Sequence, residues 1–198
     1  MKFVSKQVVL SMVLTGLLSV TLSATVREFK IDKSHSSIDF SVRHMTLSNT
    51  KGTFTDYDGV IKWDDSGKAS VISGVVKVKS VDTRDEKRDG HLRGEDFFNS
   101  DKYPEMSLVS KSISKSGKQY TMIADFTLKG VTKTIKLPLI ASAIVKDPWG
   151  NNRLNLSTTF VINRQDYGVN FNALTDNGGL IVGDNVTIAL DIEAIQAK

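Results

Sequence analysis

Apolar and polar residues alternate along much of the chain, beginning with residues 37–44, which read SIDFSVRH. Ile38, Phe40 and Val42 are apolar, whereas the positions between them are polar. A period of two places the apolar residues on one face of a β-strand, because successive side chains of a strand point to opposite faces. Strong or weaker versions of this pattern cover residues 52–63, 71–81, 106–113, 120–129, 133–145, 154–162 and 186–193. The pattern therefore predicts about eight strands.

Short turn sequences separate these runs and indicate how the strands connect. DDSGK (64–68), SKSGK (114–118), LKGVT (128–132) and DPWGNN (147–152) contain residues typical of tight turns. Most connections have hairpin length, as an antiparallel sheet needs. Several runs span ten to twelve residues, roughly 33–40 Å at about 3.3 Å per residue, and such long strands favour a closed barrel over a two-sheet sandwich. We expect an all-β, antiparallel, eight-stranded barrel.

The apolar face of such a barrel points inward. The interior is therefore either packed with side chains or holds one hydrophobic ligand, and the sequence leaves both alternatives open. Strand parity places the following side chains in the interior, as candidate ligand contacts: Phe40, Val42, Phe54, Met106, Leu108, Phe126, Leu128, Phe160, Ile162, Ile188 and Leu190.

The first residues have a different composition from the rest. Lys2 and Lys6 precede a mostly apolar run over 8–20, and small residues follow as far as Ala24. This layout is typical of a secretory signal peptide. A membrane-spanning helix needs about 20 apolar residues, and this run is shorter. We therefore expect residues 1–24 to be removed on secretion and residues 25–198 to form one domain.

Charge and residue counts exclude several classes of function. Loss of Lys2 and Lys6 lowers the formal net charge from +4 to +2, and no basic cluster is free of acids, so nucleic-acid binding is not expected. The chain has no Cys, which excludes disulfides, thiolate metal sites and a Cys nucleophile. Its three His, at 35, 44 and 91, lack metal-ligand spacing, and no G-x-S-x-G sequence marks a hydrolase. We expect neither a metal or cofactor nor an enzyme.

A charged block interrupts the strand pattern at residues 81–98, VDTRDEKRDGHLRGEDFF, where ten of eighteen residues are Asp, Glu, Lys or Arg. Thr83 and Glu86 have the spacing of a capping box, which predicts a short helix after the fourth strand. We expect about two or three turns, because Gly90 weakens a helix by about 1 kcal/mol relative to Ala.

The predicted helix has one basic face and is followed by two aromatic residues. Arg84, Arg88 and His91 fall on the same face with Leu92, while Phe97 and Phe98 form an apolar plug. The block is either a lid with solvated charges or a lid whose basic face meets the polar head of a ligand. Two further polar side chains continue inward-facing series: His44 follows Val42 and Arg164 follows Ile162. Each either marks the end of its strand or orients a ligand at the barrel mouth. His35, flanked by two serines, is expected to form hydrogen bonds at a strand end.

Several segments, taken together, resemble the YceI-like family, and they cover essentially the whole of residues 25–198. In chain order they are DKSHSSIDFSVRHM (32–45), GTFTDYDG (52–59), DTRDEKRDGHLRGEDFF (82–98), YPEM (103–106), LKGVTK (128–133), PWGNN (148–152), NRQDYGV (163–169) and VGDNVTIALDIEA (182–194). The resemblance implies a periplasmic, lipocalin-like, elongated barrel that encloses long isoprenoid or other lipid chains.

The function expected from this resemblance is binding, transport or sequestration of a long-chain isoprenoid, quinone or fatty-acyl lipid. We expect no stable membrane span after signal removal, and a homodimer is a candidate assembly. The alternative is a filled barrel that acts as a stress or interaction protein without a ligand. A hydrolase is less favoured. The head-group candidates are His44, Arg84, Arg88, His91 and Arg164.

Overall fold

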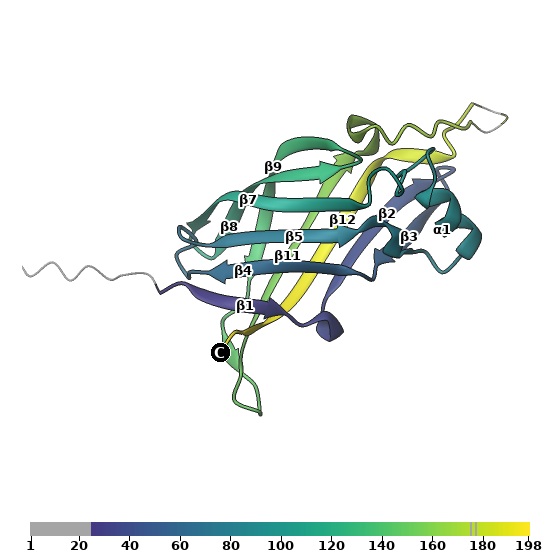
Figure 1. Cartoon of the computed structure of the whole chain (residues 1–198). Helices are drawn as coiled ribbons and strands as arrows, with labels where there is room; N and C mark the ends of the chain where they lie inside the picture. The colour runs from purple at the N-terminus through teal and green to yellow at the C-terminus, as the bar shows by residue number, and fades with distance from the viewer. Residues whose placement is uncertain (1–24, 175, 177) are drawn as a thin grey trace, which may run out of the picture.

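A computed structural model describes residues 25–174, 176 and 178–198 (Figure 1). The predicted signal peptide, residues 1–24, lies outside the described residues. The strands are β1 (Arg27–Ile31), β2 (Ser37–His44), β3 (Ser48–Phe54), β4 (Tyr57–Trp63), β5 (Val71–Lys77), β6 (Val81–Asp82), β7 (Glu105–Ser116), β8 (Gln119–Leu128), β9 (Val131–Ala141), β10 (Val145–Lys146), β11 (Asn152–Asn163) and β12 (Val182–Gln196). These described residues also include one α-helix, α1 (Glu86–Arg93), and three short 3₁₀ segments, Lys33–His35, Val78–Ser80 and Arg164–Tyr167.

The strands close into a barrel with eight positions around its wall. Three of these positions are each made of two strand segments placed end to end. β1 and β2 form the first and both pair with the same side of β12. β4 and β3 form the second, pairing with β1 and β2, and β5 and β6 form the third, pairing with β4 and β3. Single strands β7, β8, β9, β11 and β12 fill the other positions, and pairing of β11 with β12 closes the ring. All neighbours are antiparallel. The predicted eight-stranded barrel with one short helix is confirmed.

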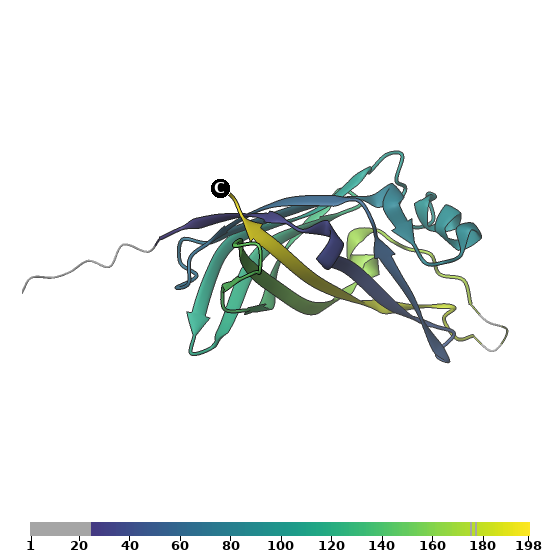
Figure 2. The same ribbon diagram turned by 90° about the horizontal axis from the view of Figure 1, so that it is seen from below.

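Side chains alternate between the inside and the outside of the barrel, as the period of two predicts. Along β8 every second residue is buried, and Met122, Ala124 and Phe126 are no more than 6% exposed. One end of the barrel, beside the C-terminus, is filled by the largest side chains. Trp63 and Phe29 are there, each 1% exposed, and the Trp63 ring centre lies 5.1 Å from that of Tyr120. We call this the closed end (Figure 2).

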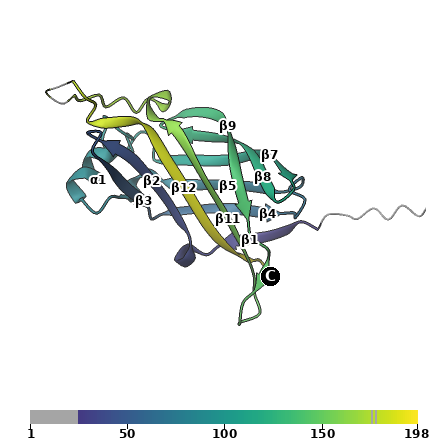
Figure 3. The same ribbon diagram turned by 180° about the vertical axis from the view of Figure 1, so that it is seen from behind.

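The opposite end is covered by α1 and the segment that follows it (Figures 1 and 3). The helix lies between β6 and β7, so it follows six strand segments, which make up three positions of the barrel wall. Phe97 is buried and Phe98 is half-buried against Phe54, with 5.9 Å between the Phe54 and Phe98 ring centres. The predicted aromatic plug is therefore present.

The start of α1 differs from the prediction. Asp85, and not Thr83, is the N-cap, and its carboxylate accepts a hydrogen bond from the backbone N–H of Arg88 (3.0 Å). Thr83 instead donates its hydroxyl to the buried carboxylate of Asp89 (2.6 Å). Arg84 lies outside the helix, with φ of 64°. Because the buried Asp89 carboxylate accepts the Thr83 hydroxyl, the N-cap lies two residues later than the capping-box spacing predicts. The sequence spacing alone does not reveal this.

No helix within the described part of the chain is both long enough and apolar enough to cross a membrane.

Candidate functional site

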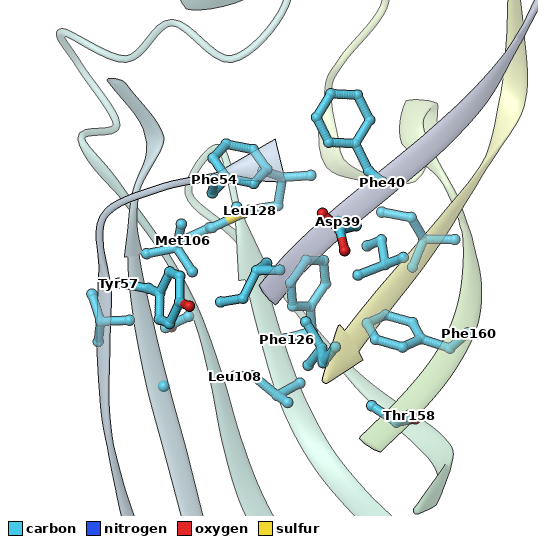
Figure 4. Close-up of a pocket in the computed structure, with 18 of the residues that line it drawn as sticks. Asp39, Phe40, Phe54, Tyr57, Met106, Leu108, Phe126, Leu128, Thr158 and Phe160 are labelled. Atoms are coloured by element: carbon cyan, nitrogen blue, oxygen red, sulfur yellow. The ribbon is translucent and has the colours of Figure 1, made fainter. Parts of the chain in front are cut away.

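The barrel interior contains an apolar cavity of about 180 Å³ (Figure 4). All eleven interior residues predicted from strand parity line it. They come from β2, β3, β7, β8, β11 and β12, so the cavity follows the barrel wall and does not lie between two elements only. A single water needs roughly 10–15 Å³ on a comparable measure, so this space is far larger than an ordinary packing defect.

Aromatic rings shape the cavity. The ring of Phe126 lies edge-on to those of Phe160 and Tyr167, with ring centres 6.0 and 5.4 Å apart, and Phe40 is tilted against Phe54 at 5.7 Å. These are the offset arrangements that aromatic pairs prefer. In Figure 4, Phe40 and Phe54 lie above Phe126 and Phe160, and all four rings line the cavity.

The few polar groups of the lining are already satisfied by the chain. The Tyr57 hydroxyl donates to the backbone carbonyl of Ser36 (2.8 Å), and the Thr158 hydroxyl donates to that of Pro138 (2.5 Å). Burial raises the pKa of Tyr57, so its phenol is neutral over the physiological range. Among the described residues, the one buried side-chain polar atom without a partner is Nε of Arg27, which does not line the cavity. The cavity therefore suits a hydrocarbon and offers little to a polar guest.

The cavity reaches the end of the barrel covered by α1. Leu92, Phe97 and Phe98 line it from the helix side, and Val169 and Val182 line it from the other side. The sequence predicted Phe97 and Phe98 as a plug and Leu92 on one face of the helix, but it did not reveal Val169, because a residue in a loop has no strand parity to indicate its direction. Tyr120, whose ring packs on Trp63 at the closed end, does not line the cavity.

A second, more polar hollow of about 840 Å³ lies between the start of α1 and the β2–β3 hairpin. It shares Asp39 and Phe40 with the apolar cavity. His44, Arg84 and Arg88 all line it, so the structure brings together three of the five predicted head-group candidates. Lys51 lines it too and was missed, because its strand parity points outward. An apolar cavity thus adjoins a hollow lined by the cations Lys51, Arg84 and Arg88 and by the carboxylates of Asp39 and Asp82.

Comparison with known proteins identifies this architecture. The model of the YceI-like domain matches residues 29–194. The chain belongs to the YceI-like family. A Salmonella newport protein named YceI is 33% identical over 196 residues, which cover 98% of this chain and 100% of that protein.

Solved structures show the same barrel. The YceI protein of Campylobacter jejuni superposes with a TM-score of 0.68 and 28% identity, covering 77% of this chain and 88% of that chain. A polyisoprenoid binding domain from Saccharophagus degradans has a TM-score of 0.60 at 15% identity, covering 85% and 98% of the two chains, and is implicated in plant cell wall breakdown. The second likeness supports the YceI-like fold alone.

Arg88 of this YceI-like barrel is largely engaged within the lid. Its Nε donates to the Thr83 hydroxyl (2.7 Å) and its Nη2 to the Thr83 carbonyl (2.8 Å), while Nη1 lies 3.9 Å from the Asp85 carboxylate. Arg84 differs, because it is exposed and only its backbone N–H is engaged, with Asp82 (2.7 Å). Of the two arginines, Arg84 is therefore freer to meet a ligand.

His91 does not lie with the other head-group candidates. Its Nε2 is 3.0 Å from the Asp96 carboxylate, and its ring stands edge-on to Phe97 and Phe171, with ring centres 5.0 and 5.3 Å apart. Phe97 stacks on Phe171 at 4.8 Å. The prediction that His91 shares a basic face with the two arginines is wrong, since Arg84 is not helical. His91 instead joins the lid to the loop after β11.

Arg164 lies in the lining but is fully engaged by the chain. It is 3% exposed, and its guanidinium donates to the carbonyls of Val169 (2.7 Å) and Gly183 (3.0 Å) and to the Asp184 carboxylate (3.2 Å). Burial lowers its pKa, and Asp184 opposes this shift. The arginine thus fastens the loop after β11 to the start of β12, which leaves little capacity to read a head group.

His35 forms the strand-end hydrogen bonds that its position predicts, with Nδ1 3.0 Å from both Asp32 and the Ser34 hydroxyl. Asp32, His35 and Glu193 are the one grouping of ligand-type side chains found among the described residues. Arg153 already supplies a cation there, with Nη1 2.8 Å from Asp32 and 2.5 Å from Glu193. Hydrogen bonds from Ser34 and Arg153 hold the pKa of Asp32 well below its usual range. This grouping is an ion network that ties β1, β11 and β12 together.

Proposed function

We propose that this protein binds a long-chain lipid, with an isoprenoid chain as the leading candidate, and carries or sequesters it. The observation that supports this most directly is the apolar cavity, lined from most of the barrel wall and extending to the α1 end. The description of the Saccharophagus relative as a polyisoprenoid binding domain also favours this ligand class. Quinones and fatty-acyl lipids share the necessary chemistry, which is a long apolar tail with a small head.

Burial of the tail supplies enough free energy for tight binding. A forty-carbon chain at about 0.3 kcal/mol per heavy atom gives roughly 12 kcal/mol, or a dissociation constant near nanomolar. The cavity of about 180 Å³ is smaller than the roughly 300–1,000 Å³ of typical ligand pockets, so such a tail must move lining side chains apart or extend beyond the mouth. We therefore expect tail length to govern affinity and the head to govern selectivity.

The polar hollow is proposed as the place of the head group. Its cationic side chains, Arg84 and Lys51, adjoin the cavity through Phe40, which lines both spaces. An anionic head, such as a pyrophosphate, would gain charge-assisted hydrogen bonds there. A neutral head would not.

We also propose that the protein acts in the periplasm after cleavage of residues 1–24, on the strength of the Lys-flanked apolar run. Intact mass of protein purified from its native host tests cleavage, and osmotic-shock fractionation tests the compartment. A mass equal to that of the full 21.8 kDa chain would contradict the proposal.

Native mass spectrometry followed by organic extraction tests the lipid-binding proposal. The expected result is protein that co-purifies with a long-chain lipid or takes one up when a dispersed polyprenol is offered. Protein that stays lipid-free under both conditions would favour the filled-barrel alternative. The same spectra report oligomeric state, so the predicted homodimer is tested in parallel.

A further inference from the structure

Among the described residues, Met45, Leu47 and Leu174 expose apolar side chains at the α1 end of the barrel. Leu47, at the tip of the β2–β3 hairpin, is 80% exposed; Leu174, in the loop between β11 and β12, is 60% exposed; and Met45 is 38% exposed. We call these residues the apolar rim. We propose that the apolar rim docks onto a lipid bilayer, so that the cavity mouth faces the membrane from which a lipid is taken or to which it is delivered. The role of the cavity in this inference rests on the proposed function.

The two loops that carry the apolar rim are joined by backbone hydrogen bonds. The N–H of Met45 donates to the carbonyl of Ile181 (2.9 Å), and the N–H of Ile181 donates to that of Ala173 (3.1 Å), next to Leu174. Leu174 itself forms an antiparallel bridge with Leu180. The rim is therefore one connected feature, although its residues are more than a hundred positions apart in the sequence.

The hairpin tip has an unusual backbone that its neighbours hold in place. Met45 and Thr46 have φ of 49° and 59°, a left-handed conformation that is uncommon for residues other than Gly. The Arg43 guanidinium donates to the carbonyl of Thr46 (2.9 Å) across this turn. A flexible tip could fold its leucine back onto the barrel, whereas this turn keeps Leu47 in solvent. Exposure of Leu47 is thus a property of the local structure.

The rim lies next to the cavity along the same strands. Val42 of β2 and Val182 of β12 line the cavity, and His44, which pairs with Val182, is the last residue of β2 before the tip. Figures 1 and 3 show the β2–β3 tip, the start of β12 and α1 at the same end of the barrel. A tail that leaves the cavity at this end therefore meets the apolar rim first.

The charge of the hairpin fits an anionic membrane surface. Residues 41–54 contain Arg43, His44 and Lys51 and no Asp or Glu. Lys51 is four residues from Leu47, about 13 Å at roughly 3.3 Å per residue, which is beyond one Debye length, so Arg43 beside the tip is the hairpin cation nearest to a membrane that holds the tip. A cation near an anionic leaflet adds about 1 kcal/mol. At the hairpin, apolar contact and charge therefore act in the same direction, whereas the loop around Leu174 has Asp176 and no Lys or Arg, so its contribution is apolar contact alone.

A bilayer fits this rim better than a protein partner does. A stable protein–protein interface buries about 800 Å² on each side, which is more than three loop side chains provide. Shallow insertion of a few apolar side chains beside basic residues is sufficient for reversible attachment to a membrane. A carrier also needs a reversible attachment, because it must leave again with its lipid.

The test is co-sedimentation of the protein with vesicles of phosphatidylethanolamine and phosphatidylglycerol. The Leu47→Ser, Leu174→Ser double variant is compared with a matched control, Ile140→Ser with Val161→Ser, whose side chains are 67% and 59% exposed on the outer face of β9 and β11. We expect the rim variant to partition roughly tenfold more weakly or worse, because binding scales with inserted apolar area, and the control to match the parent. Vesicles of phosphatidylcholine alone should bind the parent more weakly, because they lack anionic heads.

Uptake of a polyprenol dispersed without vesicles separates this inference from the proposed function. The rim variant should take up the dispersed lipid as the parent does but extract it from vesicles more slowly, with an unchanged melting temperature.

The other outcomes separate docking from lipid binding. Equal loss of vesicle binding in the control variant overturns docking and leaves the proposed function standing. The same holds if the parent takes up dispersed lipid but does not bind vesicles. A parent that binds vesicles through the rim but takes up no lipid supports docking and ends the proposed function. Rim-dependent self-association without vesicle binding would assign the rim to a second copy of the chain instead.

Discussion

The two ends of the barrel are closed by different kinds of contact. At the closed end Trp63, Phe29 and Leu154, each 1% exposed, fill the space between the strands, and Arg153 links three carboxylates across β1 and β12 and the loop before β11. At the α1 end a short lid is held by an aromatic cluster and by hydrogen bonds from Arg93 to the carbonyls of Lys79 (2.9 Å) and Val81 (3.1 Å), and apolar and cationic side chains remain in solvent. From this comparison we expect stability to depend mainly on the closed end and the proposed lipid binding to depend on the α1 end.

Truncation of a large side chain at each end gives the largest contrast. Trp63→Ala should lower the free energy of unfolding by about 3–5 kcal/mol, because it leaves a cavity among fully buried side chains. Leu92→Ala in the lid should cost only about 1 kcal/mol, because this side chain is half-buried. Urea unfolding of both variants measures the difference. Equal losses of unfolding free energy in the two variants would falsify the expectation that the closed end contributes more to stability than the lid.

A pair of neighbouring residues on β7 tests whether the cavity itself binds the lipid. Leu108 lines the cavity, while Val109 is 44% exposed on the outside of the barrel. Leu108→Asp should weaken polyprenol uptake at least roughly hundredfold, because an unpaired carboxylate in an apolar site costs several kcal/mol. Val109→Asp should leave uptake unchanged. Circular dichroism must show that both variants are folded, and equal uptake by the two would place the lipid outside the barrel.

Strand parity predicted the barrel and its lining because the period of two is imposed by the backbone itself. Leu108, Phe126 and Phe160 were placed correctly for this reason. The start of α1 was missed because the Thr83 hydroxyl bonds Asp89, six residues further along the chain, and the capping-box spacing does not contain that information. The engagement of Arg164 was missed for a similar reason, since its carbonyl partners are created by the path of a loop.

The ion network at the closed end should make stability depend on pH in a defined way. Although burial raises the pKa of Asp147, hydrogen bonds from Arg153 and Asn151 lower it to about 2, below the unfolded value of about 3.9. A depressed carboxylate pKa stabilises the fold above the unfolded pKa, and this contribution is lost as the pH falls through the folded pKa. Arg153→Gln should therefore lower the melting temperature near neutral pH, and the difference from the parent should shrink between about pH 4 and pH 2.

The control for this prediction is an exposed pair. Lys77 forms a solvent-exposed ion pair with Glu105, so Lys77→Gln should change the melting temperature little at any pH. A constant difference between Arg153→Gln and the parent over the whole acid range would show that the arginine stabilises the closed end by packing alone.

The smallest expected effect concerns the polar hollow. Arg84→Gln with Lys51→Gln should weaken binding of a polyprenyl pyrophosphate several-fold, to roughly tenfold, and leave a polyprenol of the same length unaffected. Arg88 is kept, because it bonds Thr83 and its loss would disturb the lid. Titrations of both lipids at low and high salt measure the effect, which should diminish as salt screens the charges. Equal weakening of both lipids would remove the hollow as a head-group site.

The interrupted strands give the barrel wall a crease. The three breaks, between β1 and β2, β3 and β4, and β5 and β6, lie side by side. The Tyr57 hydroxyl donates to the Ser36 carbonyl (2.8 Å), and the Thr55 N–H donates to the Ser80 carbonyl (3.2 Å), so hydrogen bonds join neighbouring breaks. On one side of the crease are β1, β4 and β5, and on the other are β2, β3 and β6, which leads into α1. Bending there would widen the mouth without breaking the hydrogen-bond ladders of either half. β12 runs unbroken past the crease and pairs with β1 on one side of it and with β2 on the other, so this strand would carry any such bend.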